Sequence, residues 1–245
     1  MNLSPKIISQ RSINFSQDNY WVNIDKPINY SSAKVVSIIK RITKAKKVGH
    51  GGTLDPFATG VLPIAVNKCT KQSNEIMNYS KKYFVEINFG EFRDTDDTSG
   101  KIVQTSKNRV NLSKFAESLT SFLGKIKQQP SKFSAIKING VRSYKLAREG
   151  KDFEMPWREV FIKSIKVLKF SNDSCELEFE CSKGTYIRTL VHDICIKNNI
   201  CGYVENLKRL EVGAFKIHQT ISLDDLKNSI MFGQSYKDGS LLDLH

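Results

Sequence analysis

The sequence predicts an α+β fold, because strand-like and helix-like segments follow one another without the regular alternation of a βαβ sheet. Several segments alternate apolar and polar residues with a period of two, and others repeat apolar residues at helical spacing. The 245 residues, 40% of them hydrophobic, suffice for one large domain or two small ones with a substantial core. No internal repeat is visible.

The first part of the chain predicts two strands and a helix. Residues 20–24 alternate as a first strand. Ser31 or Ser32 then caps a helix, because apolar residues recur after it at the i, i+3, i+4, i+7 spacing. That apolar face consists of Val35, Val36, Ile39 and Ile42. A second strand alternates through residues 83–89 and ends in a turn at residues 94–100.

The second part predicts two further helices and three strands. Residues 113–123 form a helix that Gly124 ends. Its inward side chains are Phe115, Leu119, Phe122 and Leu123. Strands at about 159–169 and 175–182 lead into a helix after Gly184, and a last strand lies near 209–217. Residues 1–18 are polar and irregular, so we expect a mobile N-terminal extension there.

The charge of the chain indicates a polyanionic partner. With 38 Lys and Arg against 25 Asp and Glu, the net charge is +13. Such an excess is most often found in proteins that bind nucleic acid. Residues 125–151 hold eight cations and one acid, Glu149, and a second basic run at residues 40–47 precedes a glycine-rich loop. A basic protein without such a partner is the alternative on charge alone.

The five cysteines are an odd number without CxxC spacing, which predicts neither a disulfide framework nor a zinc site. Cys175 and Cys181 share one face of an alternating strand, and Cys195 lies on an apolar helix stripe, so we expect all three in the core. This usage suits a reducing cytoplasm. No apolar run approaches the roughly 18 residues of a membrane span, and the N-terminus lacks a signal-peptide core.

One stretch differs from any ordinary helix or strand. Residues 49–60 read Gly-His-Gly-Gly-Thr-Leu-Asp-Pro-Phe-Ala-Thr-Gly. The residue before a proline is excluded from the helical region, so Asp55 presents its carboxylate from a loop. The neighbouring glycines let backbone come close to a ligand. A structural Asp-Pro turn is the alternative interpretation.

Residues 49–63 resemble the signature of the TruB-type tRNA pseudouridine synthases. Four more segments resemble motifs of that family in the family's order: residues 81–85, 130–150, 184–190 and 206–213. Together they cover roughly residues 20–220. The resemblance implies the pseudouridine synthase fold, with a central, mixed and largely antiparallel sheet, flanking helices, and residues of about 125–152 as a protruding insertion that grips RNA.

The resemblance also implies the site. Asp55 stands at the position of the catalytic nucleophile, and Arg188 is its expected partner. The other substrate-binding residues implied are His50, Tyr83, Tyr186 and Leu207. Each has a structural alternative: a solvated loop histidine, two core tyrosines, a surface arginine and an ordinary core leucine.

Two departures from the family pattern stand out. Gly51 replaces the usual threonine or alanine, which we expect to loosen the loop. Family members commonly continue into a PUA-like RNA-binding domain. We therefore expect residues 19–220 to be the catalytic domain and residues 221–245 a C-terminal tail too short for a full domain of that kind.

The implied reaction is the isomerisation of uridine at position 55 of the TΨC loop, without cofactor or metal. A carboxylate suits the nucleophile because it is ionised at pH 7. Attack at C1′, attack at C6 and proton abstraction at C2′ all remain open. The implied partner is the TΨC stem-loop of tRNA; we expect no membrane and no DNA partner, and we favour a monomer.

Three other interpretations compete. In the first, the chain is a catalytically weak or inactive module that binds or folds tRNA: the short C-terminal tail leaves room for a weaker grip on the substrate, whereas the intact Asp55, Tyr83 and Arg188 argue against loss of activity. An esterase interpretation of residues 50–53 lacks a G-x-S-x-G elbow. The acidic group Asp94, Asp96 and Asp97 lacks the EF-hand pattern of a calcium site, and we expect a solvated turn there.

Overall fold

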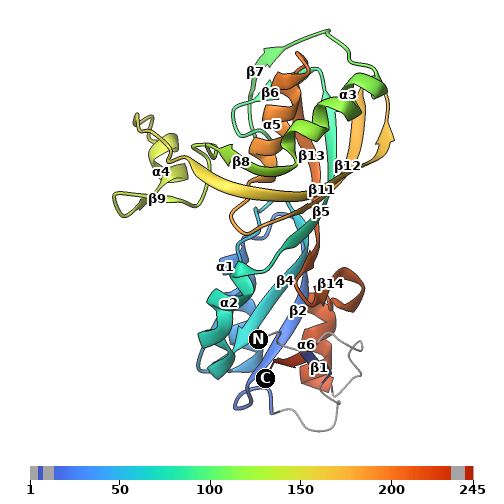
Figure 1. Ribbon diagram of the computed structural model, residues 1–245. Coiled ribbons are helices and arrows are strands. Elements are labelled where there is room, and N and C mark those ends of the chain that lie inside the picture. Colours follow the sequence, from blue (N-terminus) through green and yellow to red (C-terminus); the bar gives the residue numbers. More distant parts are fainter. Residues whose placement is uncertain (1–4, 8–13, 233–240, 245) are drawn as a thin grey trace. The chain divides into compact units, whose positions relative to one another are not determined.

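The computed structural model describes residues 5–7, 14–232 and 241–244 (Figure 1). The chain forms two compact units. Unit 1 contains the residues up to Tyr83 and those from Leu207 onward, and unit 2 is Phe84–Asn206. The chain leaves unit 1 within strand β5 (Lys81–Phe89) and returns within β13 (Gly202–Val212).

Unit 1 is built on a mixed sheet. Its strand order is β1 (Pro5–Ile7), β15 (Leu241–Leu244), β2 (Tyr20–Lys26), β4 (Thr59–Val66) and β13. Strand β3 (Val48–His50) also pairs with β4, and β14 (Phe215–Lys216) pairs with β13. The pair β4–β13 is parallel, and the other described pairs are antiparallel.

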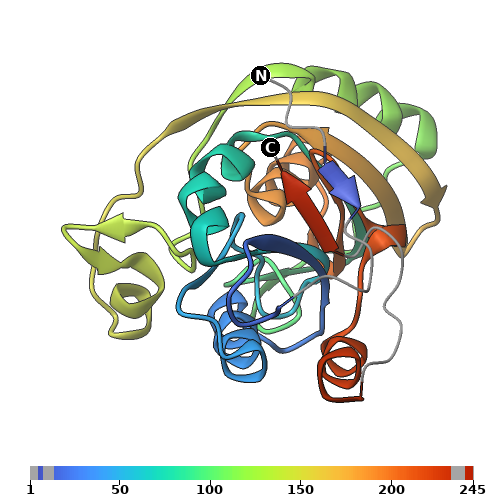
Figure 2. The same ribbon diagram turned by 90° about the horizontal axis from the view of Figure 1, so that it is seen from below.

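Helices cover both faces of this sheet. Tyr20, Val22 and Ile24 of β2 pack with α1 (Ser32–Thr43) and α6 (Leu223–Phe232), and Figure 2 shows these two helices side by side. Trp21 points the opposite way, into a cluster that includes Ile76 of α2 (Ser73–Asn78). The 3₁₀ helix η1 (Asn67–Gln72) connects β4 to α2. The period of two along β2 thus produces two cores.

The start of α1 follows the prediction. Ser31 has extended backbone angles, and its hydroxyl accepts a hydrogen bond from the Lys34 N–H at 3.1 Å, which satisfies one of the first free N–H groups. Val35 and Ile39 are buried, and Val36 and Ile42 pack against the same cluster. Ser31 is therefore the cap, and Ser32 is free for another contact.

Unit 2 continues with the strand order β13, β5, β12 (Ser174–Cys181), β11 (Arg158–Phe170) and β8 (Gly124–Gln128). Helices α3 (Leu112–Leu119) and α5 (Ile187–Lys197) supply apolar side chains to its core. The ring of Phe115 packs 5.1 Å from that of Phe170. Cys175, Cys181 and Cys195 are buried as predicted, and none of the five cysteines, all of which lie in the described part of the chain, forms a disulfide. The α+β class and the mixed, largely antiparallel sheet are confirmed.

The predicted insertion begins later than expected, because residues 124–128 form β8 inside the sheet. The part that stands apart from the strands of unit 2 holds a small hairpin and a short helix (Figure 1). The hairpin is β9 (Lys137–Ile138) with β10 (Val141–Arg142), and the helix is α4 (Ser143–Arg148). Buried Ser134 and Ser143 join their hydroxyls at 3.0 Å and tie the element together.

Several expectations about the elements were wrong. Strand β4 was not predicted. The last strand begins at Gly202 and ends at Val212, not near 209–217. Helix α3 ends at Leu119, a 3₁₀ turn η2 (Thr120–Phe122) follows, and Leu123 is 45% exposed rather than inward. Gly124, with φ of 81°, ends this segment as predicted.

The ends of the chain are described only in part. Of the expected N-terminal extension, residues 5–7 form β1, and Asn67 Nδ2 donates to the carbonyl oxygens of Ser16 and Asp18 at 3.2 and 2.8 Å. Residues 1–4 and 8–13 lie outside the described residues. The expected C-terminal tail holds α6 and β15. Within the described part of the chain, no helix is both long and apolar enough to cross a membrane.

Candidate active site

Asp55 lies half-buried in the loop between β3 and β4. The Ala58 N–H donates to the Asp55 carbonyl oxygen at 3.1 Å, which closes a tight turn around Pro56. The buried Ser32 hydroxyl accepts from the Leu54 N–H at 2.9 Å and donates to the Leu54 carbonyl at 3.1 Å. The backbone on both sides of the carboxylate is therefore fixed, and we call residues 51–60 the Asp55 loop.

Lys26 binds backbone carbonyl groups in and next to this loop. Its side chain is fully buried, and its ammonium group donates to the carbonyl oxygens of Pro27, Tyr30 and Pro56 at 2.9, 2.7 and 3.0 Å. Burial lowers the pKa of Lys26 to about 8, although the negative charge of Asp55 opposes that shift. All three donors of the ammonium group are thus used by backbone.

Arg209 of β13 is also buried, with 1% of its surface exposed. Its Nε donates to the Val61 carbonyl at 2.8 Å, its Nη1 to Thr53 at 3.2 Å and its Nη2 to Gly52 at 3.1 Å. The guanidinium group therefore holds both ends of the Asp55 loop. Arg209 lies within the motif at residues 206–213, but the sequence predicted no role for it.

His50 is neutral in this setting. The Gly52 N–H donates to its Nδ1 at 3.3 Å, so Nδ1 carries no proton. Burial lowers the pKa of His50, and the positive charge of Arg209 lowers it further. The proton of the ring therefore sits on Nε2.

Tyr83 and Leu207 are 8% and 3% exposed, and both belong to unit 1 with Asp55 and His50. At this burial, a pocket wall and an ordinary core position look alike, so their roles stay predictions. The space around Gly51 gives a reason for the glycine. A Cβ atom there would lie 2.6 Å from Ile76 Cγ2, so the isoleucine fills the space that a larger residue needs.

Arg188 and Tyr186 belong to unit 2, at the start of α5. The Arg188 guanidinium is buried, and it donates to the carbonyl oxygens of Thr95 at 2.7 Å and Phe133 at 3.1 Å. It also lies 3.4 Å from Asp97 Oδ2. The alternative of a surface arginine is wrong.

Asp97 corrects the expectation of a solvated turn, since it is only 4% exposed. Its Oδ1 accepts from Thr95 Oγ1 at 2.8 Å and from the Ser99 N–H at 2.9 Å. Oδ2 faces Arg188. The Ser99 hydroxyl also donates to Oδ1. Three groups of its own turn and one guanidinium thus surround the Asp97 carboxylate.

Two neighbours of Arg188 extend this arrangement. Tyr186 is fixed through its backbone: its N–H donates to Gln128 Oε1 at 3.1 Å, and Gln128 Nε2 donates to its carbonyl at 3.3 Å. One turn after Arg188, His192 Nδ1 lies 2.9 Å from Asp96 Oδ1, which raises the pKa of His192. The adjacent acids 96 and 97 therefore bind two α5 side chains four residues apart.

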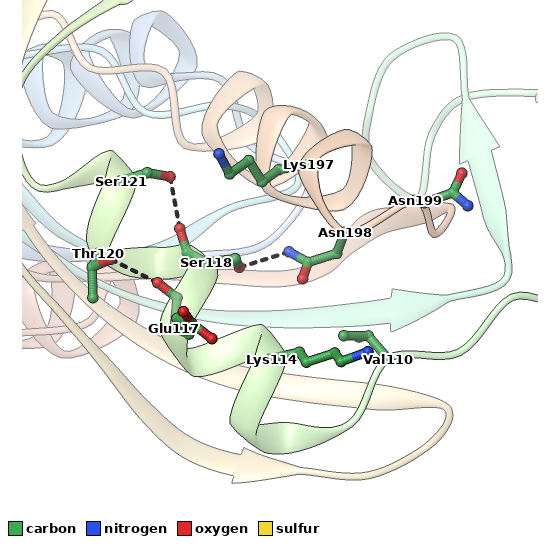
Figure 3. Close-up of a pocket in the computed structure, with 9 residues that line it drawn as sticks. All are labelled: Val110, Lys114, Glu117, Ser118, Thr120, Ser121, Lys197, Asn198 and Asn199. Carbon is green, nitrogen blue, oxygen red and sulfur yellow. Dashed lines mark hydrogen bonds between the residues drawn. The ribbon is translucent and has the colours of Figure 1, made fainter.

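The hollow drawn in Figure 3 is a different place. It lies between α3 and the end of α5, and none of the six predicted site residues lines it. Its walls are polar and mostly exposed, with Ser118 Oγ accepting from Asn198 Nδ2 at 2.8 Å. It supplies neither a buried nucleophile nor an apolar pocket for a base.

Solved structures resemble this arrangement of strands and helices. A chain in the "Structure of H/ACA RNP bound to a substrate RNA containing 2′-deoxyuridine" is 21% identical with a TM-score of 0.69, and the match covers 99% of this chain and 69% of that one. A chain of the Cbf5-Nop10-Gar1 complex is 26% identical with a TM-score of 0.68, and the match covers 88% and 57%. The fold is that of the pseudouridine synthases.

The sequence comparisons narrow this class. The model of the TruB family pseudouridylate synthase N-terminal domain matches residues 40–187, and the model of the tRNA pseudouridylate synthase B C-terminal domain matches residues 188–245. The chain therefore belongs to the TruB family of pseudouridylate synthases. The tRNA pseudouridine synthase B of Ehrlichia ruminantium (strain Gardel) is 42% identical, over 89% of this chain and 74% of that protein. That of Rickettsia akari (strain Hartford) is 43% identical, over 92% and 79%.

Proposed function

We propose that this protein converts uridine to pseudouridine at position 55 in the TΨC loop of tRNA, with the side chain of Asp55 as nucleophile. The observation that carries the proposal is the Asp55 loop, in which Arg209, Lys26 and Ser32 hold the backbone around one carboxylate. Fixing a reacting group in advance lowers the barrier of a covalent step.

The reaction needs only this kind of chemistry. The bond between N1 and C1′ breaks, a bond between C5 and C1′ forms, and the proton that C5 loses is balanced by the one that N1 gains. Atoms and electrons balance without a redox partner, so the proposal includes no cofactor. The carboxylate holds the sugar or the base covalently while the uracil turns, or it takes a proton from C2′.

The other site residues take the roles that the family resemblance implies. Arg188 is the proposed partner of the Asp55 carboxylate, and Tyr83 and Tyr186 are proposed to contact the target base. Leu207 is the proposed wall of the uracil pocket. Neutral His50 offers an Nε2–H to RNA, or its ring fills the gap that an extruded nucleotide leaves.

A basic face of unit 1 supports tRNA as the partner. Residues 40–71 contain seven cations and a single acid, which is Asp55 itself. Two hydrogen bonds join Lys47 to Asn67, so the two basic segments lie side by side. All seven side chains are exposed, and none forms an ion pair with another described residue. The basic face consists of Lys40, Arg41, Lys44, Lys46, Lys47, Lys68 and Lys71.

Such unpaired cations favour contacts with a phosphate backbone. The site of action proposed with this partner is the cytoplasm, which agrees with five cysteines that form no disulfide. The proposed form is a monomer.

The deciding experiment maps pseudouridine by position in an unmodified tRNA transcript, without added metal, for wild type and Asp55→Asn. We expect product at position 55 from wild type only, with RNA affinity of the variant within about tenfold, since removing one buried-site carboxylate leaves the phosphate contacts intact. Wild type that binds tRNA without forming product supports the alternative of a tRNA-binding or folding module. Product from Asp55→Asn at the wild-type rate removes Asp55 from the chemistry.

A further inference from the structure

We infer that Arg209 is a positioning residue for the nucleophile, acting as a clip that closes the Asp55 loop before RNA arrives. The inference rests on the proposed role of Asp55. Its basis is geometric: one guanidinium donates to the Gly52 and Thr53 carbonyl oxygens on one side of the loop and to the Val61 carbonyl on the other. The seven residues between Thr53 and Val61 carry the carboxylate.

The contact is built into the backbone as well. Strand β13 runs parallel to β4 with Arg209 opposite Gly60. Gly60 has φ of 98°, and a Cβ atom there would lie 2.3 Å from the Arg209 carbonyl oxygen. Only glycine allows this approach. The same close contact brings the guanidinium next to the Asp55 loop, and Arg209 is only 1% exposed there.

Shape as well as charge defines this role. The planar guanidinium presents five N–H donors in a fixed fork, so one arginine reaches carbonyl groups that point at it from two directions. A lysine at the same position keeps the positive charge but offers a compact ammonium group. Lys26 uses all of its donors on Pro27, Tyr30 and Pro56, so it is not available as a substitute.

Arg209 also contributes to keeping the His50 ring neutral, after burial. Arg209 contributes to lowering the pKa of His50, and the Gly52 backbone links the two residues, because its N–H donates to His50 Nδ1 while its carbonyl accepts from Arg209. Loss of the guanidinium therefore removes the hydrogen bond to the Gly52 carbonyl, next to the N–H that His50 Nδ1 accepts from. This gives a readout that does not depend on turnover.

The test compares Arg209→Lys and Arg209→Gln with Lys208→Gln as the matched control. Lys208 precedes Arg209 on β13, so its side chain leaves the opposite face of the strand, and its substitution removes the same charge. Four quantities are measured for each: thermal unfolding, RNA affinity, single-turnover rate at saturating tRNA, and hydrogen exchange of the amides at residues 52–55. The ring of His50 is titrated by NMR in parallel.

For folded Arg209→Gln, we expect a single-turnover rate at least about 100-fold below wild type with RNA affinity within about threefold, because small displacements of a reacting group cost rates of that order. Arg209→Lys is expected to lose about tenfold or more for the same reason. Amides 52–55 exchange faster in both, and the pKa of His50 rises toward its ordinary value in Arg209→Gln. Lys208→Gln matches wild type.

A rate within about threefold of wild type in folded Arg209→Lys overturns the inference, and so does a loss of RNA affinity equal to the loss of rate. If Arg209→Gln does not fold, Arg209→Lys decides alone. Wild type that forms no pseudouridine refutes the proposed function instead, and then the exchange of amides 52–55 still reports on the clip. Unchanged exchange in both variants overturns it.

Discussion

The Arg188 guanidinium lies 3.4 Å from Asp97 Oδ2, and the side chains of both residues are 5% exposed. The partners are 91 residues apart in the chain, and the turn that carries Asp97 uses Thr95 and Ser99 to hold the carboxylate in place. A buried ion pair of this kind fixes the orientation of the arginine. Removing the Arg188 side chain would leave the buried Asp97 carboxylate without this counterion, and removing Asp97 would take one buried anion away from the guanidinium.

Replacing Asp97 with alanine is therefore expected to lower the free energy of unfolding by about 3 kcal/mol. Urea denaturation of wild type and variant measures the difference. Asp94→Ala is the control, because Asp94 is an exposed residue of the same turn, and it should stay well above Asp97→Ala in stability. If both variants lose the same amount of unfolding free energy, the ion pair between Asp97 and Arg188 does not contribute more to stability than an exposed acid of the same turn.

The stability of the chain should depend on pH through His192. The carboxylate of Asp96, whose Oδ1 lies 2.9 Å from His192 Nδ1, raises the pKa of His192 in the folded state, and the negative charge of Asp193 raises it further. A raised pKa stabilises the fold fully below the ordinary value of about 6.5, and this contribution is lost as pH rises through the folded value. We expect wild type to exceed His192→Gln in unfolding free energy at pH 5.5 and the gap to narrow by pH 8.5.

Urea denaturation across that range checks this expectation. The Asp96→Asn variant should remove the pH dependence of the difference, because the neutral amide does not favour imidazolium. A difference between wild type and His192→Gln that is constant with pH would contradict the predicted titration.

Gly51→Ala is expected to be destabilising by about 1–3 kcal/mol, because the added methyl overlaps Ile76 Cγ2. Ile76→Ala alone removes a buried side chain and should cost about 2–5 kcal/mol. The double variant should lose less unfolding free energy than the sum of the two single losses, since the methyl group occupies part of the vacated space. Thermal or urea unfolding of all four proteins completes the cycle, and strict additivity contradicts the packing described here.

Salt dependence tests the basic face. Replacing Lys44, Lys46 and Lys47 with glutamine should flatten the slope of log K against log salt by roughly 2 to 3, at about 0.7–0.9 per phosphate contact. The matched control replaces three exposed lysines of β11 whose charges are already paired: Lys163, Lys166 and Lys169, with Glu180, Glu178 and Glu176. An equal change in both variants shows that general charge, rather than this face, sets the affinity.

Local signals predicted the elements that depend on local physics. The alternation of β2 and the cap and apolar stripe of α1 were recognised because the residues involved are neighbours in sequence. Strand β4 was not predicted, and it contains Pro63, a residue that is atypical of a central strand because it lacks an N–H. The Pro63 carbonyl accepts from the Gly51 N–H at 2.8 Å.

The supports of the site were harder to predict. Asp97 looked like one of three acids in a polar turn, because nothing nearby in sequence shows that Arg188 neutralises it. Arg209 looked like one more cation in a basic chain for the same reason. Both roles depend on pairings between distant segments, and a single sequence without structure does not contain them.

The long reach of Arg209 has a consequence for biosynthesis. Its Nη2 contacts a carbonyl 157 residues earlier in the chain. Because synthesis proceeds from the N-terminus, the segment with Asp55 is made long before the side chain that closes it. Unit 1 itself is interrupted by unit 2, so its parallel β4–β13 pair forms only after the whole of unit 2 has been translated. Such distant contacts slow folding, so the Asp55 loop is expected to reach its final geometry only after the segment with Arg209 has been made.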